Sequence, residues 1–336
     1  MAERYAIGLD LGGTDLKAGL VTPAGTVEAF TRRPSRTHES AEAPLEVIVA
    51  AAEKLRSRAG ARAPIGLGCP GAIEPASGAL LGTTPHLPHW DSMPLRERMA
   101  ERLGGRLVVD NDANCAALAE ARVGAARGAR VSVTLTLGTG IGCGIVVDGR
   151  IVHGASGGAG EIGHLPLGSG ERPCRCGVER CVEPEASASG LLASARAAGL
   201  RVSEAAEVFA AAAQGDPVAT RLVDRMADRL GAVIAVAINL LNPDVVAVGG
   251  GVSRAGEPLF ARLRSAVDRY SLASHRRALH LLPAALGERS GTVGAGLLAW
   301  EAETGSRRTR ARPAASRAGR ALSRSGPASR PRSAGR

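Results

Sequence analysis

VSVTLTLGTGIGCGIVVDGRIVHGASGGAGEIGHLPLGSGERPCRCGVERCVE, residues 131–183, carries most of the chemical signals in this sequence. Two apolar segments, 131–137 and 141–147, flank the turn Gly138-Thr139-Gly140. Short apolar runs joined by glycine turns are typical of strands in hairpins. Such a turn also suits phosphate, because a backbone without Cβ atoms can bring its N–H groups against phosphate oxygens. A plain hairpin is the simpler interpretation of any one such turn.

The start of the chain repeats this pattern. YAIGLDL, the turn Gly12-Gly13-Thr14 and LKAGLVT parallel the hairpin around Gly138. This weak repeat, at a spacing of about 126 residues, suggests two related α/β lobes. A third apolar strand, 244–248, runs into three more glycines, and together the three turns favour a nucleotide, although none matches a Walker or G-x-G-x-x-G motif. The candidate nucleotide-binding residues are Asp10, which could hold Mg²⁺ through water, with Gly12, Gly13, Thr14, Lys17, Gly138, Thr139, Gly140, Gly249, Gly250 and Gly251.

A polar junction between a strand and a helix offers a catalytic base. The segment 106–128 has an apolar strand, then Asp110-Asn111-Asp112, then an apolar helix face. Phosphoryl transfer from ATP needs a carboxylate that orients the attacking hydroxyl and accepts its proton. We expect Asp112 to stay ionised, because a helix N-terminus favours negative charge. The alternative is a plain helix cap.

Three cysteines and a histidine form the most specific motif. His164, Cys174, Cys176 and Cys181 provide four ligands for a tetrahedral zinc ion with no open position, which is the pattern of a structural site. Free buried thiols are the alternative, but the Arg, Gly and Glu around them make that environment too polar. The metal would lock a loop that carries two carboxylates able to accept hydrogen bonds from a polyol, Glu161 and Glu183. Solvent-exposed acids are the alternative for these two.

Composition narrows the class of protein. The 336 residues are enough for two domains, and aromatic residues make up only 2%, so few side chains could stack on bases. The net charge of +10 lies in the segment 304–336, which holds ten arginines and no acid. This composition predicts a disordered tail, able to bind polyanions only non-specifically. The sequence has no apolar run long enough to span a membrane, no secretory leader and no disulfide framework, and we therefore expect a cytoplasmic protein.

The remaining segments complete an α/β pattern. Helical spacing of apolar residues predicts helices over 41–59, 94–103 and 291–303, and an Ala-rich helical region over 185–232 that breaks at Gly215-Asp216-Pro217. A short strand is expected at 65–73, running into a Pro-Gly turn.

With these motifs in order, the chain resembles the ROK family of sugar kinases and repressors from about Tyr5 to Trp300. The resemblance rests on DLGGTDLK, GLGCPGAIEP, TTPHLPHW, VVDNDANCAALAE, TLGTGIGCGIVVDGRIVHGASGGAGEIGH, CRCGVERC and VVAVGGGV. It implies the actin-like, hexokinase-like (ribonuclease H-like) fold, with two α/β lobes around an ATP- and sugar-binding cleft. The expected division is 1–110 completed by the helix 291–303, then 111–290 with the zinc loop, then the tail 304–336.

The resemblance also implies roles for residues. Asp112 would be the base for a sugar hydroxyl, and His164 would hold zinc with one ring nitrogen while the other faces the sugar, so that the metal fixes its tautomer. The glycine turns at Gly12 and Gly138 would cradle phosphates, and Gly249 to Gly251 would lie near the adenosine. The residues expected to touch the sugar are Gly71, Thr84, Asn111, Asp112, Glu161, His164 and Glu183.

Three positions depart from the family pattern. Arg180 stands where the family has Gly before the last Cys, and a residue with positive φ there would be strained, so the loop path is expected to differ. Pro184-Glu185 replaces Ala-Tyr, and His86 replaces an Asn. These changes leave zinc binding and catalysis standing but affect the choice of sugar.

The implied activity is that of an ATP-dependent hexose kinase, and in the first place a glucokinase acting on the 6-hydroxyl of glucose with Mg·ATP. Kinases for N-acetylmannosamine, N-acetylglucosamine or fructose are alternatives, and polyphosphate could replace ATP. A sugar-sensing repressor of the family would need a helix-turn-helix domain, for which the few residues before Asp10 leave no room. We expect a homodimer or homotetramer.

Overall fold

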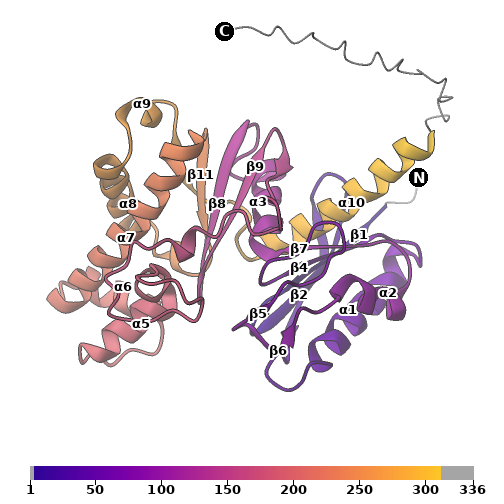
Figure 1. The fold of residues 1–336 in the computed structure, drawn as a ribbon, viewed down its shortest axis with the longest axis horizontal. Helices are drawn as coiled ribbons and strands as arrows, with labels where there is room; N and C mark the ends of the chain where they lie inside the picture. The colour runs from indigo at the N-terminus through magenta and orange to yellow at the C-terminus, as the bar shows by residue number, and fades with distance from the viewer. Residues whose placement is uncertain (1–3, 312–336) are drawn as a thin grey trace, which may run out of the picture.

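Two five-stranded sheets with the same strand order form the framework of the molecule (Figure 1). The computed structural model describes residues 4–311. In each sheet three antiparallel strands are followed by two parallel ones. The repeat expected from the two glycine hairpins therefore includes the order and direction of all five strands. The first sheet, in spatial order, is β3 (Val27–Pro34), β2 (Asp15–Val21), β1 (Ala6–Leu11), β4 (Ile65–Cys69) and β7 (Leu107–Asn111). The second is β10 (Arg150–Ile151), β9 (Ile141–Val147), β8 (Val131–Leu137), β11 (Val245–Gly249) and β12 (His280–Pro283).

Helices form at the predicted places. The expected break in the Ala-rich region is confirmed: Asp216 caps the next helix, because its Oδ1 accepts hydrogen bonds from the N–H groups of Val218 and Ala219 at 2.8 Å, and Pro217 fits the first helical position. The helices are α1 (Ala43–Ala59), α2 (Leu95–Leu103), α3 (Asp112–Val123), α4 (Glu183–Ala186), α5 (Ala188–Ala197), α6 (Ala205–Ala213), α7 (Pro217–Leu241), α8 (Glu257–Tyr270), α9 (Ala273–Arg276) and α10 (Ser290–Ala311), with 3₁₀ turns η1 (Ile162–His164), η2 (Val252–Ala255) and η3 (Gly287–Arg289). The sequence did not predict α8, β12 or the small hairpin of β5 (Thr83–Thr84) and β6 (Leu87–Asp91).

Each sheet has its own core of aliphatic side chains. In the first, Ile7 and Leu9 pack with α1 and α2; in the second, Val133 and Leu135 pack with α7 and α8. The aromatic content of the chain is low, and both cores consist mainly of Leu, Ile, Val and Ala, as expected. Each sheet is therefore covered by helices that bury its apolar face.

Two helices, α3 and α10, lie directly against backbone at the junction between the lobes. A Cβ added to Gly66 of β4 would lie 1.8 Å from the carbonyl oxygen of Ala295 in α10. A Cβ on Gly294 of α10 would lie 1.7 Å from the carbonyl oxygen of Cys115 in α3. On the other side of α3, a Cβ on Gly144 of β9 would lie 2.7 Å from the carbonyl oxygen of Ala113. The first sheet, α10, α3 and the second sheet are thus in contact through backbone atoms, which only glycine permits.

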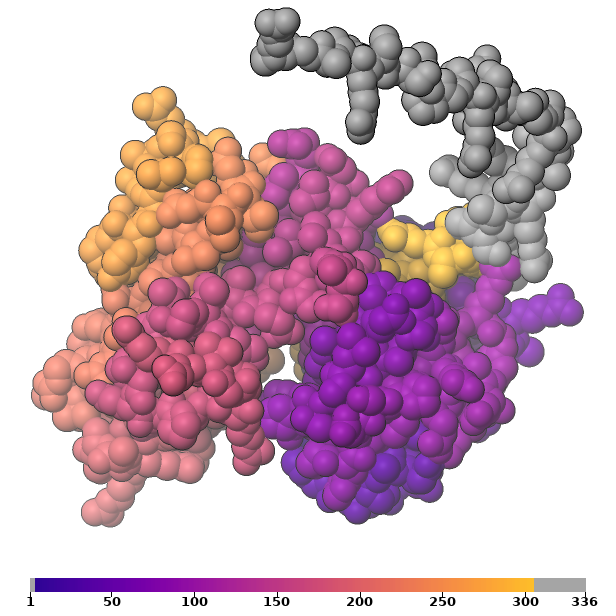
Figure 2. All heavy atoms as spheres, viewed as in Figure 1, coloured from indigo at the N-terminus to yellow at the C-terminus, as the bar shows by residue number. Residues whose placement is uncertain are grey.

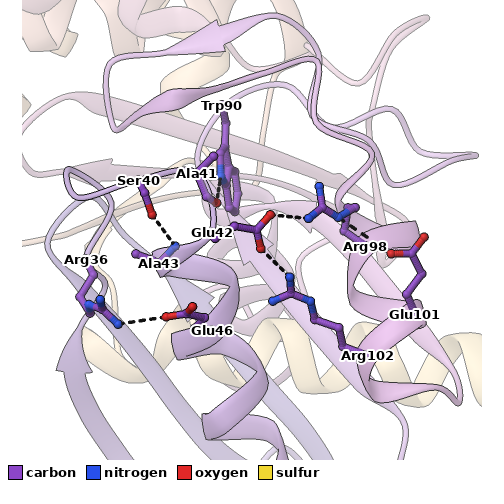
Figure 3. A network of polar contacts seen from close by, with 10 residues as sticks. All are labelled: Arg36, Ser40, Ala41, Glu42, Ala43, Glu46, Trp90, Arg98, Glu101 and Arg102. Atoms are coloured by element: carbon purple, nitrogen blue, oxygen red, sulfur yellow. Dashed lines mark hydrogen bonds and ion pairs between the residues drawn. The ribbon is translucent and has the colours of Figure 1, made fainter.

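A polar network fastens the outer corner of the first lobe (Figure 3). Glu42, just before α1, accepts hydrogen bonds from Arg98 and Arg102 of α2. The indole N–H of the buried Trp90 on β6 donates to the carbonyl oxygen of Ala41 at 2.8 Å. These contacts fix the β5–β6 hairpin, which carries Thr84, against α1.

The C-terminal helix is longer than predicted. Instead of ending at residue 303, α10 continues to Ala311, so residues 304–311 are a correction to the expected disordered tail. Apolar packing of Val293, Leu297 and Trp300 holds the first part of this helix. The rest of the predicted tail, 312–336, lies outside the described residues. Among the helices that the structure describes, none is both long and apolar enough to cross a membrane.

The backbone contact of α10 gives a first prediction. Replacing Gly by Ala inside a helix normally stabilises it by about 1 kcal/mol. For Gly294→Ala we expect the opposite, a loss of at least about 2 kcal/mol in the free energy of unfolding, because the new methyl group meets the Cys115 carbonyl. Denaturant unfolding measures the change. Gly158→Ala, whose Cβ would point into open space, is the control, and equal stability of the two variants would contradict the contact.

Candidate active site

The three polar residues at the junction of β7 and α3 have separate tasks. The buried Asp110 accepts hydrogen bonds from Asn114 Nδ2 at 2.9 Å and from the Asn111 N–H at 2.7 Å, and its other oxygen lies 2.7 Å from Nε2 of His153. Asn111 caps α3 through its Oδ1 and donates its Nδ2 to the carbonyl oxygen of Gly71 at 3.0 Å. Asp112 accepts one hydrogen bond, at 2.8 Å from the Ala113 N–H to Oδ1. Of the three, Asp112 keeps the most capacity for a ligand.

The expectation that the helix dipole keeps Asp112 ionised is wrong in direction. Burial raises the pKa of this carboxyl from 3.8 to about 7, and the negative charge of Asp10 adds to the effect. The hydrogen bond from Ala113 N–H lowers it by less. The pKa of Asp10 is itself raised by burial, against the opposing effect of Lys17, whose Nζ lies 3.3 Å from Asp10 Oδ2. Loss of water around these acids outweighs the dipole.

The residues predicted to bind the sugar lie in two groups. On the first lobe, the carbonyl oxygen of Gly71 accepts a hydrogen bond from Asn111, and a Cβ on Gly71 would lie 3.5 Å from Thr84 of β5. On the second lobe, His164 Nε2 lies 3.7 Å from Glu161 Oε2, and the charge of Glu183 acts on Glu161. The charge of Glu161 adds to the raised pKa of Asp112, so this carboxylate of the second group lies near enough to act on Asp112.

The three glycine turns end strands on both sheets. Gly12 and Gly13 close the β1–β2 hairpin, and Thr14 and Lys17 follow. Gly138 to Gly140 close the β8–β9 hairpin, where Glu183 Oε2 accepts a hydrogen bond from the Ile141 N–H at 2.8 Å. Since β11 pairs with β8 in parallel, Gly249 to Gly251 lie at the same sheet edge, and Gly250 touches the backbone of Leu137. The second and third turns are therefore neighbours, and the first belongs to the other lobe.

The predicted metal ligands meet. The ligand atoms of His164, Cys174, Cys176 and Cys181 all lie within 4.8 Å of one another. His164 turns its Nδ1 toward Cys181 Sγ, at 3.4 Å, and its Nε2 toward Glu161. Three thiols and one imidazole nitrogen at this spacing fit the donor set of a structural zinc ion.

Although Arg180 replaces the glycine of the family pattern, the loop keeps a left-handed backbone at this position. Arg180 has φ of 56°, the left-handed region that costs a non-glycine residue energy. Its Nε donates to the carbonyl oxygen of Gly168 at 3.1 Å, and its own carbonyl accepts from the Gly168 N–H at 2.7 Å. These two bonds hold a conformation that was expected to be avoided.

Two histidines in this region were not among the predicted site residues. His153 pairs with Asp110 as described above. The half-buried His86 follows Thr84, and its Nδ1 would lie 3.1 Å from a Cβ on Gly13 in the first glycine turn. Burial lowers the pKa of His86. The substitution of Asn by His was visible in the sequence, but its position beside Gly13 was not.

A hollow opens between the two lobes. Figure 2 shows a hollow between the first lobe, in indigo, and the loop-rich part of the second lobe, in pink. A separate cavity of about 770 Å³, between α3 and α10, is lined by Arg122, Leu297 and Trp300 among others and contains none of the predicted site residues.

Comparison with known proteins agrees with this architecture. A two-lobed α/β fold with duplicated sheets, glycine turns and a carboxylate at the junction defines a sugar kinase of the actin-like, hexokinase-like class. The chain belongs to the ROK family, whose sequence model matches residues 6–302. It is 36% identical to a glucokinase of Halalkalibacterium halodurans, over 90% of this chain and 97% of that protein.

Solved structures give the same result. A ROK hexokinase from Thermus thermophilus aligns with a TM-score of 0.78 at 36% identity, covering 90% of this chain and 99% of the other. A ROK family glucokinase from Streptomyces griseus, in complex with glucose and AMPPNP, aligns with a TM-score of 0.76 at 32% identity, covering 88% and 99%. The predicted family and fold class are confirmed.

The raised pKa of Asp112 predicts an effect on stability. Its ionisation is disfavoured in the folded protein, so the carboxylate destabilises the fold increasingly from pH 4 to 7, and fully above pH 7. Asp112→Asn should therefore raise the melting temperature at pH 8 by at least about 2 °C, and the difference should vanish near pH 4. Thermal unfolding at both pH values measures this, with the exposed Asp91→Asn as control. A lower melting temperature at pH 8 would contradict the burial effect.

Proposed function

We propose that this protein is an ATP-dependent glucokinase that phosphorylates the 6-hydroxyl of glucose. The main support is the carboxylate of Asp112, which accepts a single hydrogen bond and has a pKa near 7. It lies at the junction of two lobes, and each lobe has a glycine hairpin. The similarity to glucokinases over most of the chain supports the choice of substrate.

In the proposed reaction, Asp112 accepts the proton of the sugar hydroxyl while that oxygen attacks the γ-phosphorus of ATP and ADP leaves. A base with a pKa near 7 suits this step, because it is ionised at neutral pH and still basic enough to take the proton. The turns at Gly12–Thr14 and Gly138–Gly140 would hold phosphate oxygens through backbone N–H groups, and Gly249–Gly251 would lie near the adenosine.

The sugar would be held by both groups of residues. Glu161, His164 and Glu183 would accept or donate hydrogen bonds to its hydroxyls from the second lobe, and Asn111 with the turn at Gly71 from the first. Closure of the lobes would exclude water that could otherwise hydrolyse ATP.

Two bound ions would serve the proposed reaction in different ways. Asp10, with Lys17 at 3.3 Å, would hold the Mg²⁺ of Mg·ATP through water. Zinc bound by His164 and the three cysteines would supply rigidity rather than chemistry, because four protein ligands leave no open position. With its Nδ1 on the metal, His164 would direct its Nε2 to the sugar.

An assay across sugars tests the substrate and the base. We expect the highest kcat/KM with glucose among glucose, mannose, fructose and the N-acetyl hexosamines, with ATP preferred over polyphosphate. Asp112→Asn should lower kcat by roughly 10²–10⁴-fold while KM for ATP changes little. A preference for an N-acetyl hexosamine would replace the proposed substrate, and near-normal turnover of the variant would exclude Asp112 as the base.

The pH profile tests the role of Asp112 independently. Since only the ionised carboxylate can accept the proton, kcat/KM should fall on the acid side with an apparent pKa of about 7. An acid limb that lies near pH 4 would mean that another group is the base.

Metal analysis tests the zinc site. We expect one zinc ion per chain, lost in Cys174→Ser and Cys181→Ser together, with a raised KM for glucose and a smaller change for ATP. Cys143→Ser, a buried cysteine outside the cluster, should keep its zinc. Purified protein without zinc would contradict the proposed site.

Assembly as a homodimer or homotetramer and a cytoplasmic location stay predictions from the sequence. The same holds for the division of the chain at residue 110.

A further inference from the structure

Residues 152–160, which we call the strap, cross from the second lobe to the first. The strap leaves β10 with a hydrogen bond from the Val152 N–H to the carbonyl oxygen of Ile145 at 2.9 Å. It closes on itself where the Ala159 N–H donates to the carbonyl oxygen of His153 at 3.1 Å. It returns to the second sheet at Gly160, against the backbone of Cys143 in β9, directly before Glu161.

The strap touches the first lobe at two points. One is the pair of His153 Nε2 and Asp110 Oδ2, at 2.7 Å. The other is Gly157, where a Cβ would lie 2.0 Å from the carbonyl oxygen of Ile73, so the backbones are in direct contact. Between these points, residues 154–156 are exposed and small, and they bring no apolar side chain into a core. The polar pair and the one backbone contact therefore attach the strap to the first lobe, whereas Val152 packs against the core of the second.

Asp110 is well placed to transmit this contact to the reaction centre. Its side chain is 8% exposed, and both carboxylate oxygens have partners. Oδ2 faces His153, and Oδ1 accepts hydrogen bonds from Asn111 N–H and Asn114 Nδ2. It precedes Asp112 by two positions, and both asparagines belong to the cap and first turn of α3. Hydrogen bonding to Asp110 raises the pKa of His153, which strengthens the pair as an ion pair.

We propose that His153 is a positioning residue, which acts through Asp110 to set the distance between the base at Asp112 and the sugar-binding carboxylate at Glu161. The pair of His153 and Asp110 links Asp112 and Glu161. Asp112 begins α3 two residues after Asp110, and Glu161 directly follows the strap that His153 anchors. This inference rests on the proposed role of Asp112. It assigns to His153 no contact with the sugar or ATP.

The test compares His153→Ala, His153→Gln and the control His280→Ala, an exposed histidine at the far edge of the second sheet. We expect His153→Ala to lower kcat/KM for glucose by about 10–100-fold, because a misplacement near 1 Å has effects of this size. KM for ATP should stay within about two-fold, because His153 and Gly157 contact Asp110 and Ile73 rather than a glycine turn. His153→Gln, whose amide can still donate to Asp110, should recover activity to within roughly three-fold of the wild type. His280→Ala should match the wild type.

A double-mutant cycle with Asp110→Asn shows whether the effect passes through that carboxylate. If it does, kcat/KM for glucose of the double variant with His153→Ala should be no lower than that of the less active single variant. Additive losses, or equal losses in the kinetics of glucose and of ATP, would overturn the proposal, and so would wild-type kinetics of His153→Ala. Parallel assay of Asp112→Asn separates the two proposals: an inactive Asp112→Asn with a normal His153→Ala sinks only the positioning role, whereas an active Asp112→Asn removes the base itself.

Discussion

The close backbone contact of α3 and α10 is the constraint on which the rest of this structure depends. Glycines at 66, 144 and 294 let carbonyl groups of one element occupy the space where a side chain of the next would be. Two sheets with separate cores are thereby joined through one helix whose first residue is Asp112. The proposed base thus stands where backbone of both sheets meets α3 and α10.

The same junction determines the electrostatics of the site. Asp10 from β1 and Asp112 from α3 are brought together where little water remains, and Lys17 offsets only part of their charge. Buried acids that repel one another take up protons more readily. The fold thus spends stability to hold a carboxylate that is half-ionised near neutral pH, which is typical of functional sites. Asp110, two residues earlier on β7, differs from Asp112 in that His153 and two asparagine groups occupy its carboxylate oxygens.

Local patterns in the sequence predicted much of this arrangement. The glycine hairpins, the strand-to-helix junction and the break before Pro217 depend on neighbours in the chain, and each formed as expected. The cysteine spacing brought His164 and the three thiols together for the same reason, since three of the four ligands lie within eight residues. By contrast, β12 was missed because its formation depends on pairing with β11 rather than on a local signal. The helix α8 was also missed, although its apolar residues Leu259, Leu263 and Ala266 recur at helical spacing.

By itself, the sequence determined the family, the duplicated pattern of strands and the identity of the candidate ligands and base. Only the tertiary structure decided which polar groups are already satisfied, that Asp112 has a raised rather than a normal pKa, and that His153 reaches Asp110 from 43 residues away in the chain. The physical reason is that burial and charge–charge distance are properties of the assembled fold. A dipole at a helix end can be inferred from local sequence, but the water that a second lobe removes cannot.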